Sequence, residues 1–287
     1  MNLIVKMISF AVCLTALSMT SAVSADDKST HSGIKLYTLD CGTLFVPDLN
    51  GFSIEGRLAG MSTIMSNPCF LIRHPKGDLL WDLGYQESLA DKVDGVTFYG
   101  AFHKSMAIKL SAQLAQLGLS PKDIDFVAIS HLHDDHIGNA NLFSESTFIA
   151  NEQEHASLFS AESRATADNF SLYSALEKSK TVLFKDSYDV FGDGSALIEK
   201  MPGHTLGSAV LLLKLHNSGA VLLSGDLYTH AKAREMNLVP RFSMDKKKIL
   251  ASRIRFEALA KEEAAKVIIQ HEKSDFEALP RFPGYLD

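Results

Sequence analysis

The stretch Ser130-His131-Leu132-His133-Asp134-Asp135-His136 constrains this chain more than any other part of it. It directly follows the apolar run Phe126-Val127-Ala128-Ile129, which predicts a buried strand. Alternate residues of an extended segment point the same way, so His131 and His133 share one face. Asp135 and His136 can turn back toward that face where the chain leaves the strand. Imidazoles and carboxylates bind divalent metal ions, and the stretch therefore predicts a metal site.

Three later polar residues also stand beside predicted strands. His204 lies in the turn Met201-Pro202-Gly203-His204-Thr205-Leu206-Gly207-Ser208, whose glycines let the backbone approach an ion closely. Asp226 follows the apolar run 220–223, and His271 follows the run 267–270. A single histidine at the end of a strand is more often a hydrogen-bonded polar residue than a ligand. The cluster from His131 to His136 is much harder to explain in that way.

The first 25 residues predict a secretory signal peptide. Lys6 supplies a positive charge, residues 7–19 form an apolar run, and Val23-Ser24-Ala25 offers small side chains for cleavage. A membrane span needs roughly 20 apolar residues, so an uncleaved anchor is the less favoured alternative. We expect residues 26–287 to form one globular domain that is periplasmic or secreted, with no stable membrane anchor after cleavage.

The charge and the cysteine content bear on possible partners and on disulfide formation. The chain has a formal net charge of −6 and no basic run, which argues against a nucleic-acid partner. Cys41 and Cys69 remain after removal of the N-terminal segment. In an exported protein they can form one disulfide, or they can be two buried thiols, and the sequence leaves both open.

Short apolar runs alternate with helical segments along the rest of the chain. Segment 86–104 has no clear period and predicts a loop over the site. Asp82 is the last residue of a predicted strand and either orients a ligand histidine or caps a turn. Two groups of strands, each followed by helices, predict an α/β (α+β) domain of two packed sheets with helices outside. The expected strands are 34–39, 43–46, 69–73, 79–82, 126–129, 147–150, 181–184, 196–200, 209–215, 220–224 and 266–270, and the expected helices are 105–117, 151–159 and 246–263.

The pattern His131-x-His133-x-Asp135-His136, followed by His204, Asp226 and His271, is similar to that of the metallo-β-lactamase superfamily. The tail, with Gln270-His271-Glu272 and residues 278–287, resembles the N-acyl-homoserine lactonase branch. The resemblance covers nearly the whole chain after the N-terminal segment. It implies a four-layer αββα sandwich of two mixed β-sheets with helices on the outer faces. It also implies two divalent metal ions, most often Zn²⁺, although cobalt, iron and manganese suit the same ligands.

The resemblance assigns roles to individual residues. His131, His133 and His204 would hold the first ion, Asp135, His136 and His271 the second, and Asp226 would bridge them. A metal-bridging hydroxide would attack the carbonyl carbon of a lactone. Asp135 would either pass a proton to the leaving ring oxygen or serve as a ligand alone.

One position departs from the lactonase branch. Members of that branch place a tyrosine three residues after the bridging aspartate, where this chain has Thr229 between Tyr228 and His230. A shift of one residue on an extended segment turns a side chain to the opposite face. Tyr228 is the candidate catalytic residue, with Thr229 and His230 as alternatives for the substrate contact. Candidates for an apolar groove that holds an acyl chain are Tyr99, Phe102, Met106, Met236 and Phe242.

These expectations define a main hypothesis and its rivals. The main hypothesis is an exported di-metal hydrolase that opens the lactone ring of N-acyl-homoserine lactones, a small-molecule substrate. The first alternative is a hydrolase of organophosphate triesters or aryl esters on the same scaffold. A β-lactamase is less favoured, and a metal-binding protein without turnover is least favoured, because catalytic sites leave a coordination position open. The oligomeric state stays open, a homodimer included.

Overall fold

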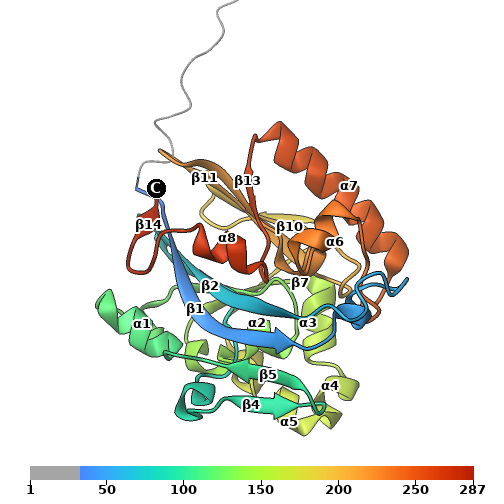
Figure 1. The fold of residues 1–287 in the computed structure, drawn as a ribbon. Coiled ribbons are helices and arrows are strands. Elements are labelled where there is room, and N and C mark those ends of the chain that lie inside the picture. Colours follow the sequence, from blue (N-terminus) through green and yellow to red (C-terminus); the bar gives the residue numbers. More distant parts are fainter. Residues whose placement is uncertain (1–32) are drawn as a thin grey trace, which may run out of the picture.

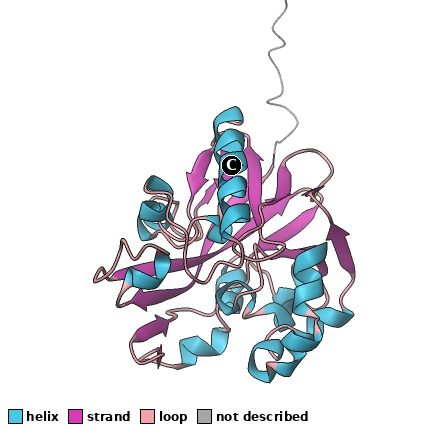
Figure 2. Cartoon of the chain, turned by 90° about the vertical axis from the view of Figure 1, so that its right-hand side faces the viewer, coloured by secondary structure: helices cyan, strands magenta, loops and turns pink. Residues whose placement is uncertain are grey.

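The computed structural model describes residues 33–287, so the predicted signal segment 1–25 lies outside the described residues. Within the described range, no helix has both the length and the apolar character needed to cross a membrane. The chain forms two β-sheets packed face to face, and helices lie on both sides of the strands (Figures 1 and 2). The helices are α1 Leu110–Gln116, α2 Asp134–Ile137, α3 Glu152–Leu158, α4 Ala161–Ala165, α5 Ala167–Phe170, α6 Ala231–Glu235, α7 Lys246–Glu262 and α8 Lys273–Glu277.

The first sheet is mixed and runs in the order β4-β5-β1-β2-β3-β6-β7-β8, with β14 also paired to β1. Its first strands form antiparallel pairs, whereas β3, β6, β7 and β8 are parallel. The strands are β1 Lys35–Val46, β2 Thr63–His74, β3 Gly77–Trp81, β4 Val96–Phe98, β5 Phe102–Ser105, β6 Phe126–Ala128, β7 Thr147–Asn151, β8 Thr181–Phe184 and β14 Tyr285–Leu286.

The second sheet runs in the order β13-β12-β11-β10-β9. Its strands are antiparallel except for β12 and β13. The strands are β9 Ser187–Asp189, β10 Ala196–Lys200, β11 Ala209–Leu215, β12 Gly219–Leu223 and β13 Lys266–Ile268.

The two-residue period of the strands divides their apolar side chains between a core between the sheets and cores on the outer faces. Phe70 and Ile72 of β2 point between the sheets, while Leu71 packs outward in the core shared with α1. Leu211 of β11 likewise points inward, while Leu212 packs in the core shared with α7. Each fully buried side chain of this size stabilises the fold by about 1.5–3 kcal/mol. The layers are thus helices, sheet, sheet and helices, which confirms the predicted αββα architecture.

The bounds of three predicted strands agree fully with the structure, whereas the two longest strands, β1 and β2, extend beyond the predicted segments. Strands predicted at 181–184, 196–200 and 209–215 match β8, β10 and β11. The helix predicted from residue 105 begins instead at Leu110, because Phe102–Ser105 pairs with β1 as β5. Segment 86–104 is therefore only partly a loop, and its second half forms the β4–β5 hairpin.

Cys41 and Cys69 form a disulfide between β1 and β2, with a Cα–Cα distance of 5.8 Å. Both side chains are fully buried. The structure therefore decides between the two states that the sequence left open.

Candidate metal centre

All seven predicted ligands meet where the chain leaves strands of the two sheets. His131 and His133 follow β6, and α2 then begins at Asp134. His204 lies in the turn between β10 and β11, Asp226 follows β12, and His271 follows β13. Four separate segments of the sequence thus converge on one place. Ligands that leave buried strands are held rigidly, as a metal site requires.

The first group consists of three imidazoles. His131 Nε2 lies 2.8 Å from His133 Nδ1, and His204 Nε2 lies 3.1 Å from each of these two atoms. Zinc–nitrogen bonds of about 2.0–2.1 Å in a tetrahedron separate neighbouring nitrogens by about 3.3 Å. Three nitrogen atoms spaced in this way fit the face of a tetrahedral metal site.

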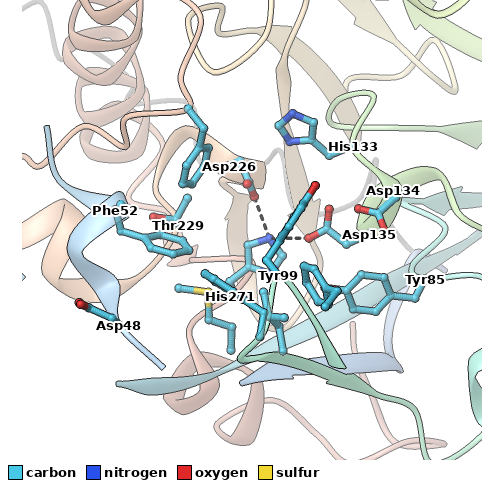
Figure 3. Close-up of a pocket in the computed structure, with 16 residues that line it drawn as sticks. Asp48, Phe52, Tyr85, Tyr99, His133, Asp134, Asp135, Asp226, Thr229 and His271 are labelled. Carbon is cyan, nitrogen blue, oxygen red and sulfur yellow. Dashed lines mark ion pairs between the residues drawn. The ribbon is translucent and has the colours of Figure 1, made fainter. Parts of the chain in front are cut away.

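The second group consists of Asp135, His136 and His271. Asp135 Oδ2 lies 3.6 Å from His136 Nε2 and 3.5 Å from His271 Nε2. The two imidazole nitrogens lie 3.3 Å apart. Figure 3 shows His271 between the carboxylates of Asp135 and Asp226.

Asp226 connects the two groups. Its Oδ2 atom lies 3.3 Å from His204 Nε2 and 3.9 Å from His131 Nε2, in the first group. Its Oδ1 atom lies 2.9 Å from His271 Nε2 and 3.4 Å from His136 Nε2, in the second. One oxygen facing each group is the arrangement of a carboxylate that bridges two ions. The donor set therefore fits two divalent metal ions of the zinc type.

His131, His204 and Asp226 have the protonation states that suit metal binding. Burial lowers the pKa of His131 well below its usual value and that of His204 to about 3, so both are neutral near pH 7. Burial alone would raise the pKa of Asp226, but the surrounding imidazoles outweigh it and hold the pKa well below the usual value. Neutral imidazoles and an ionised carboxylate are the forms that bind a metal ion. Burial alone would lower the pKa of His136 and of His271, but the neighbouring carboxylates outweigh it and raise both.

A pocket of about 360 Å³ opens beside this cluster (Figure 3). His133, Asp135, Asp226 and His271 lie along it. Most of the remaining wall is apolar and comes from β1, β2, the β4–β5 hairpin and two loops. The apolar lining residues are Leu44, Phe52, Met65, Phe98, Phe102 and Phe242.

The groove prediction is right for three of its five residues. Tyr99, Phe102 and Phe242 line the pocket. Met106 instead packs with Tyr85 and Leu89, and Met236 packs against the small core under Phe52. The last two assignments were wrong because loop sequences do not reveal which side of the chain faces the site.

Comparison with known proteins identifies the family. The family model described as the metallo-beta-lactamase superfamily matches residues 62–271, which include all seven clustered side chains. The chain belongs to the metallo-β-lactamase superfamily. Within it, the N-acyl homoserine lactonase AttM of Azorhizobium caulinodans is 28% identical over 88% of this chain and 99% of its own length. The N-acyl homoserine lactonase AiiA of Bacillus thuringiensis subsp. kurstaki is 24% identical over 88% and 98%.

Solved structures of an N-acyl homoserine lactone hydrolase and of a lactonase share the fold. An N-acyl homoserine lactone hydrolase with N-hexanoyl-L-homoserine at its catalytic metal centre superposes with a TM-score of 0.73 at 23% identity, covering 88% of this chain and 98% of the other. AidC, a dizinc quorum-quenching lactonase, gives a TM-score of 0.64 at 18% identity, covering 89% and 90%. These likenesses support the αββα fold described above.

The structure does not bring Tyr228, the candidate catalytic residue, to the metal centre. Tyr228 points away, and its hydroxyl donates to Glu257 at 3.0 Å while the Arg253 guanidinium lies 4.5 Å from its ring centroid. Thr229 lines the pocket instead. Alternation along the extended segment turns the two neighbours to opposite faces.

Asp82 orients a ligand histidine rather than merely capping a turn. It is fully buried, and its Oδ2 atom lies 3.0 Å from His136 Nδ1. Its Oδ1 atom accepts the backbone N–H of Ser130 at 2.6 Å. Asp82 also has a φ of 56°, a left-handed conformation that aspartate and asparagine tolerate better than most residues. The Asp82 side chain thus holds both the backbone at Ser130, where the ligand-bearing segment begins, and the orientation of the His136 ring.

We expect Asp82→Asn to weaken metal binding by about 10–100-fold. Asparagine tolerates the same backbone conformation and keeps one oxygen for the Ser130 N–H, so the change removes mainly the acceptor for His136. Dissociation constants from chelator competition measure the effect. Asp78→Asn, at the other end of β3 beside Arg73, is the matched control. Unchanged affinity in Asp82→Asn would contradict the orienting role.

Glu154 is a structural residue of the site that sequence reasoning missed. It is buried on α3 and accepts the Leu132 N–H at 2.8 Å through Oε1. Its Oε2 atom accepts the Thr205 hydroxyl at 2.9 Å and the Gly207 N–H at 2.8 Å. One carboxylate therefore ties the loop of His131 and His133 to the loop of His204. A glutamate three residues after the first residue of a predicted helix carries no signal of this role.

His230 lies near the site but serves α6. Its Nδ1 atom accepts the N–H of Ala233 at 3.2 Å and caps the helix. Burial lowers the pKa of His230 to about 4. The unprotonated ring is the form that can accept this hydrogen bond.

The pKa of His230 predicts an acid-dependent loss of stability. The unfolded chain gains a proton as the pH falls through about 6.5, while the folded ring stays neutral until about pH 4, so stability is lost across that window by up to about 3 kcal/mol. His230→Asn keeps a helix-capping oxygen and does not titrate. Urea unfolding of both metal-free proteins between pH 7 and 4.5 measures the difference. If the free energies of unfolding of the two proteins change with pH in parallel, the prediction is wrong.

Proposed function

We propose that this protein opens the lactone ring of N-acyl-homoserine lactones and is exported. The observation that supports the proposal is the meeting of two ligand groups, joined by Asp226, with a mostly apolar pocket. A homoserine lactone carries a reacting ester at one end and an acyl chain at the other. The ligand cluster suits the reacting ester, and the apolar wall suits the acyl chain. The similarity to AttM and AiiA supports the same substrate class.

The residues of the chain divide the chemistry among them. His131, His133 and His204 would hold one ion, Asp135, His136 and His271 the other, with Asp226 between them. Two divalent ions in these positions, most often zinc, supply a nucleophilic hydroxide at neutral pH and polarise the lactone carbonyl. The apolar wall from Phe52, Phe98 and Phe102 binds the acyl chain and excludes bulk water from the reacting ester.

Asp135 is the residue best placed to move a proton. It lines the pocket, and its Oδ2 atom faces His136 and His271. Ring opening forms a bond between the carbonyl carbon and a water oxygen and breaks the bond to the ring oxygen. The ring oxygen then takes up a proton, which the Asp135 carboxyl would deliver after accepting it from the attacking hydroxide.

Export is proposed on two independent grounds. Residues 1–25 have the charge, apolar run and small residues of a signal peptide. The buried disulfide between Cys41 and Cys69 is typical of proteins that fold in an oxidising compartment. Fractionation of cells that produce the full chain, with N-terminal sequencing of the mature protein, tests this part. A product that retains residues 1–25 in the cytoplasm would refute it.

A substrate panel tests the activity. The metal-loaded protein is assayed with N-hexanoyl- and N-decanoyl-homoserine lactone, with a phosphotriester, with an aryl ester and with a chromogenic β-lactam. We expect rapid lactone opening, detected as acid release, and far slower turnover of the other substrates. Cleavage of the phosphotriester without lactone opening would overturn the proposal. Protein treated with a chelator serves as the blank.

A further inference from the structure

The pocket wall offers few hydrogen-bond donors outside the ligand cluster. Asp48 and Asp134 line it with carboxylates, which accept hydrogen bonds and donate none. Asp134 is in addition paired with Lys104 at 3.1 Å. The Tyr99 side chain is 91% exposed, so its hydroxyl is already hydrated. Two hydroxyl groups remain on the wall, those of Tyr85 and Thr229.

Tyr85 presents the more accessible hydroxyl of the two. Thr229 is 1% exposed, and its Oγ1 atom is enclosed by protein without a hydrogen-bond partner. Tyr85 is 5% exposed, and its hydroxyl makes no hydrogen bond to any residue in the range 33–287, yet it is not among the enclosed atoms. Figure 3 shows Tyr85 on the side of Asp134 and Asp135, across the pocket from Thr229 and Phe52.

The ring of Tyr85 is fixed in place. A Cβ atom on Gly42 of β1 would lie 2.9 Å from Tyr85 Cδ2, so glycine is what allows the ring to pack there. The Lys104 ammonium lies 5.0 Å from the ring centroid, and Met106 and Leu89 pack beside the ring. A side chain held by packing keeps its polar group in one position, which is how a binding group is preorganised.

We infer that the Tyr85 hydroxyl donates a hydrogen bond to the amide carbonyl oxygen of the substrate. This contact makes the pocket selective for N-acylamino lactones over simple alkyl lactones. The inference rests on the proposed function. An amide carbonyl that enters an apolar pocket loses its water and needs a donor in exchange. The ligand cluster is occupied with the reacting ester, so the amide must find its donor on the wall.

The charges around Tyr85 suit a donor. Burial, and then the negative charges of Asp135, Asp134 and Asp226, raise the pKa of Tyr85 well above its usual value. The phenol therefore keeps its proton over the pH range in which the enzyme would work. The carboxylates that line the pocket can accept the amide N–H but cannot replace the donor.

The test compares two substrates in one variant. In Tyr85→Phe we expect kcat/KM for N-hexanoyl-homoserine lactone to fall about tenfold or more, because a site built around a hydrogen bond discriminates strongly. We expect kcat/KM for γ-decalactone, which has an alkyl chain and no amide, to change less than about twofold. Calorimetric binding of ring-opened N-hexanoyl-homoserine should weaken in parallel, while metal content and unfolding temperature stay the same.

Each other outcome has a separate meaning. Equal losses for both substrates, or none, would overturn the inference about Tyr85. A selective loss in Tyr99→Phe, Tyr228→Phe or Thr229→Val, in place of Tyr85→Phe, would overturn it as well and assign the contact elsewhere. Absence of lactone opening in the unmodified protein would instead overturn the proposed function.

Discussion

Replacing Asp226 with alanine is expected to abolish metal binding and hydrolysis together, with kcat/KM falling on the order of 10³-fold or more. The physical reason lies in its two oxygens, which face separate imidazole groups at 3.3 Å and 2.9 Å. Without them, five imidazoles, four of them buried, are left with no bridging negative charge. Metal analysis of the purified variant and lactone kinetics measure the two effects.

Asp226→Asn separates the two halves of this role. The amide keeps the shape of the carboxylate but offers a single oxygen, so one group of ligands loses its partner. We expect this variant to retain about one metal ion for each chain, fewer than the unmodified protein and more than Asp226→Ala. Full metal content with full activity in Asp226→Ala would refute the bridging assignment.

Replacing Glu154 with alanine is expected to destabilise the protein by about 3 kcal/mol or more. The change leaves two buried donors, on Thr205 and Gly207, and one partly buried donor, on Leu132, without their acceptor, and each buried one costs about 1–3 kcal/mol. The two loops that it joins carry His131, His133 and His204. Metal affinity should therefore fall together with stability, which denaturant unfolding and chelator competition measure.

Glu152→Ala is the matched control for that variant. Glu152 lies on the exposed side of the same helix, two residues away, so its loss tests helix α3 without touching the loops. We expect a change within about 0.5 kcal/mol, as for most surface substitutions. Equal effects of the two changes would show that the helix, and not the Glu154 carboxylate, holds the site together.

The sequence determined the fold class and the seven clustered residues. Nearly continuous apolar runs such as Ala209–Leu215 indicate strands that are buried on both faces. The spacing of His131, His133 and His136 is local enough to be recognised without a structure. The likeness to a known family then connected His204, Asp226 and His271 to them. The first signal depends on residues that lie close together in the chain. The second depends on the order in which the ligand residues follow one another in the family.

Only the tertiary structure decided which other side chains complete the site. The sequence favoured Tyr228, whereas the pocket receives Thr229 and Tyr85. Glu154, Tyr85 and the pairing of Cys41 with Cys69 likewise became apparent from contacts between distant segments. The physical reason is that a ligand motif is set by spacing along one strand end, while a pocket wall is set by which loops pack together. That packing depends on burial across both sheets, and no local pattern records it.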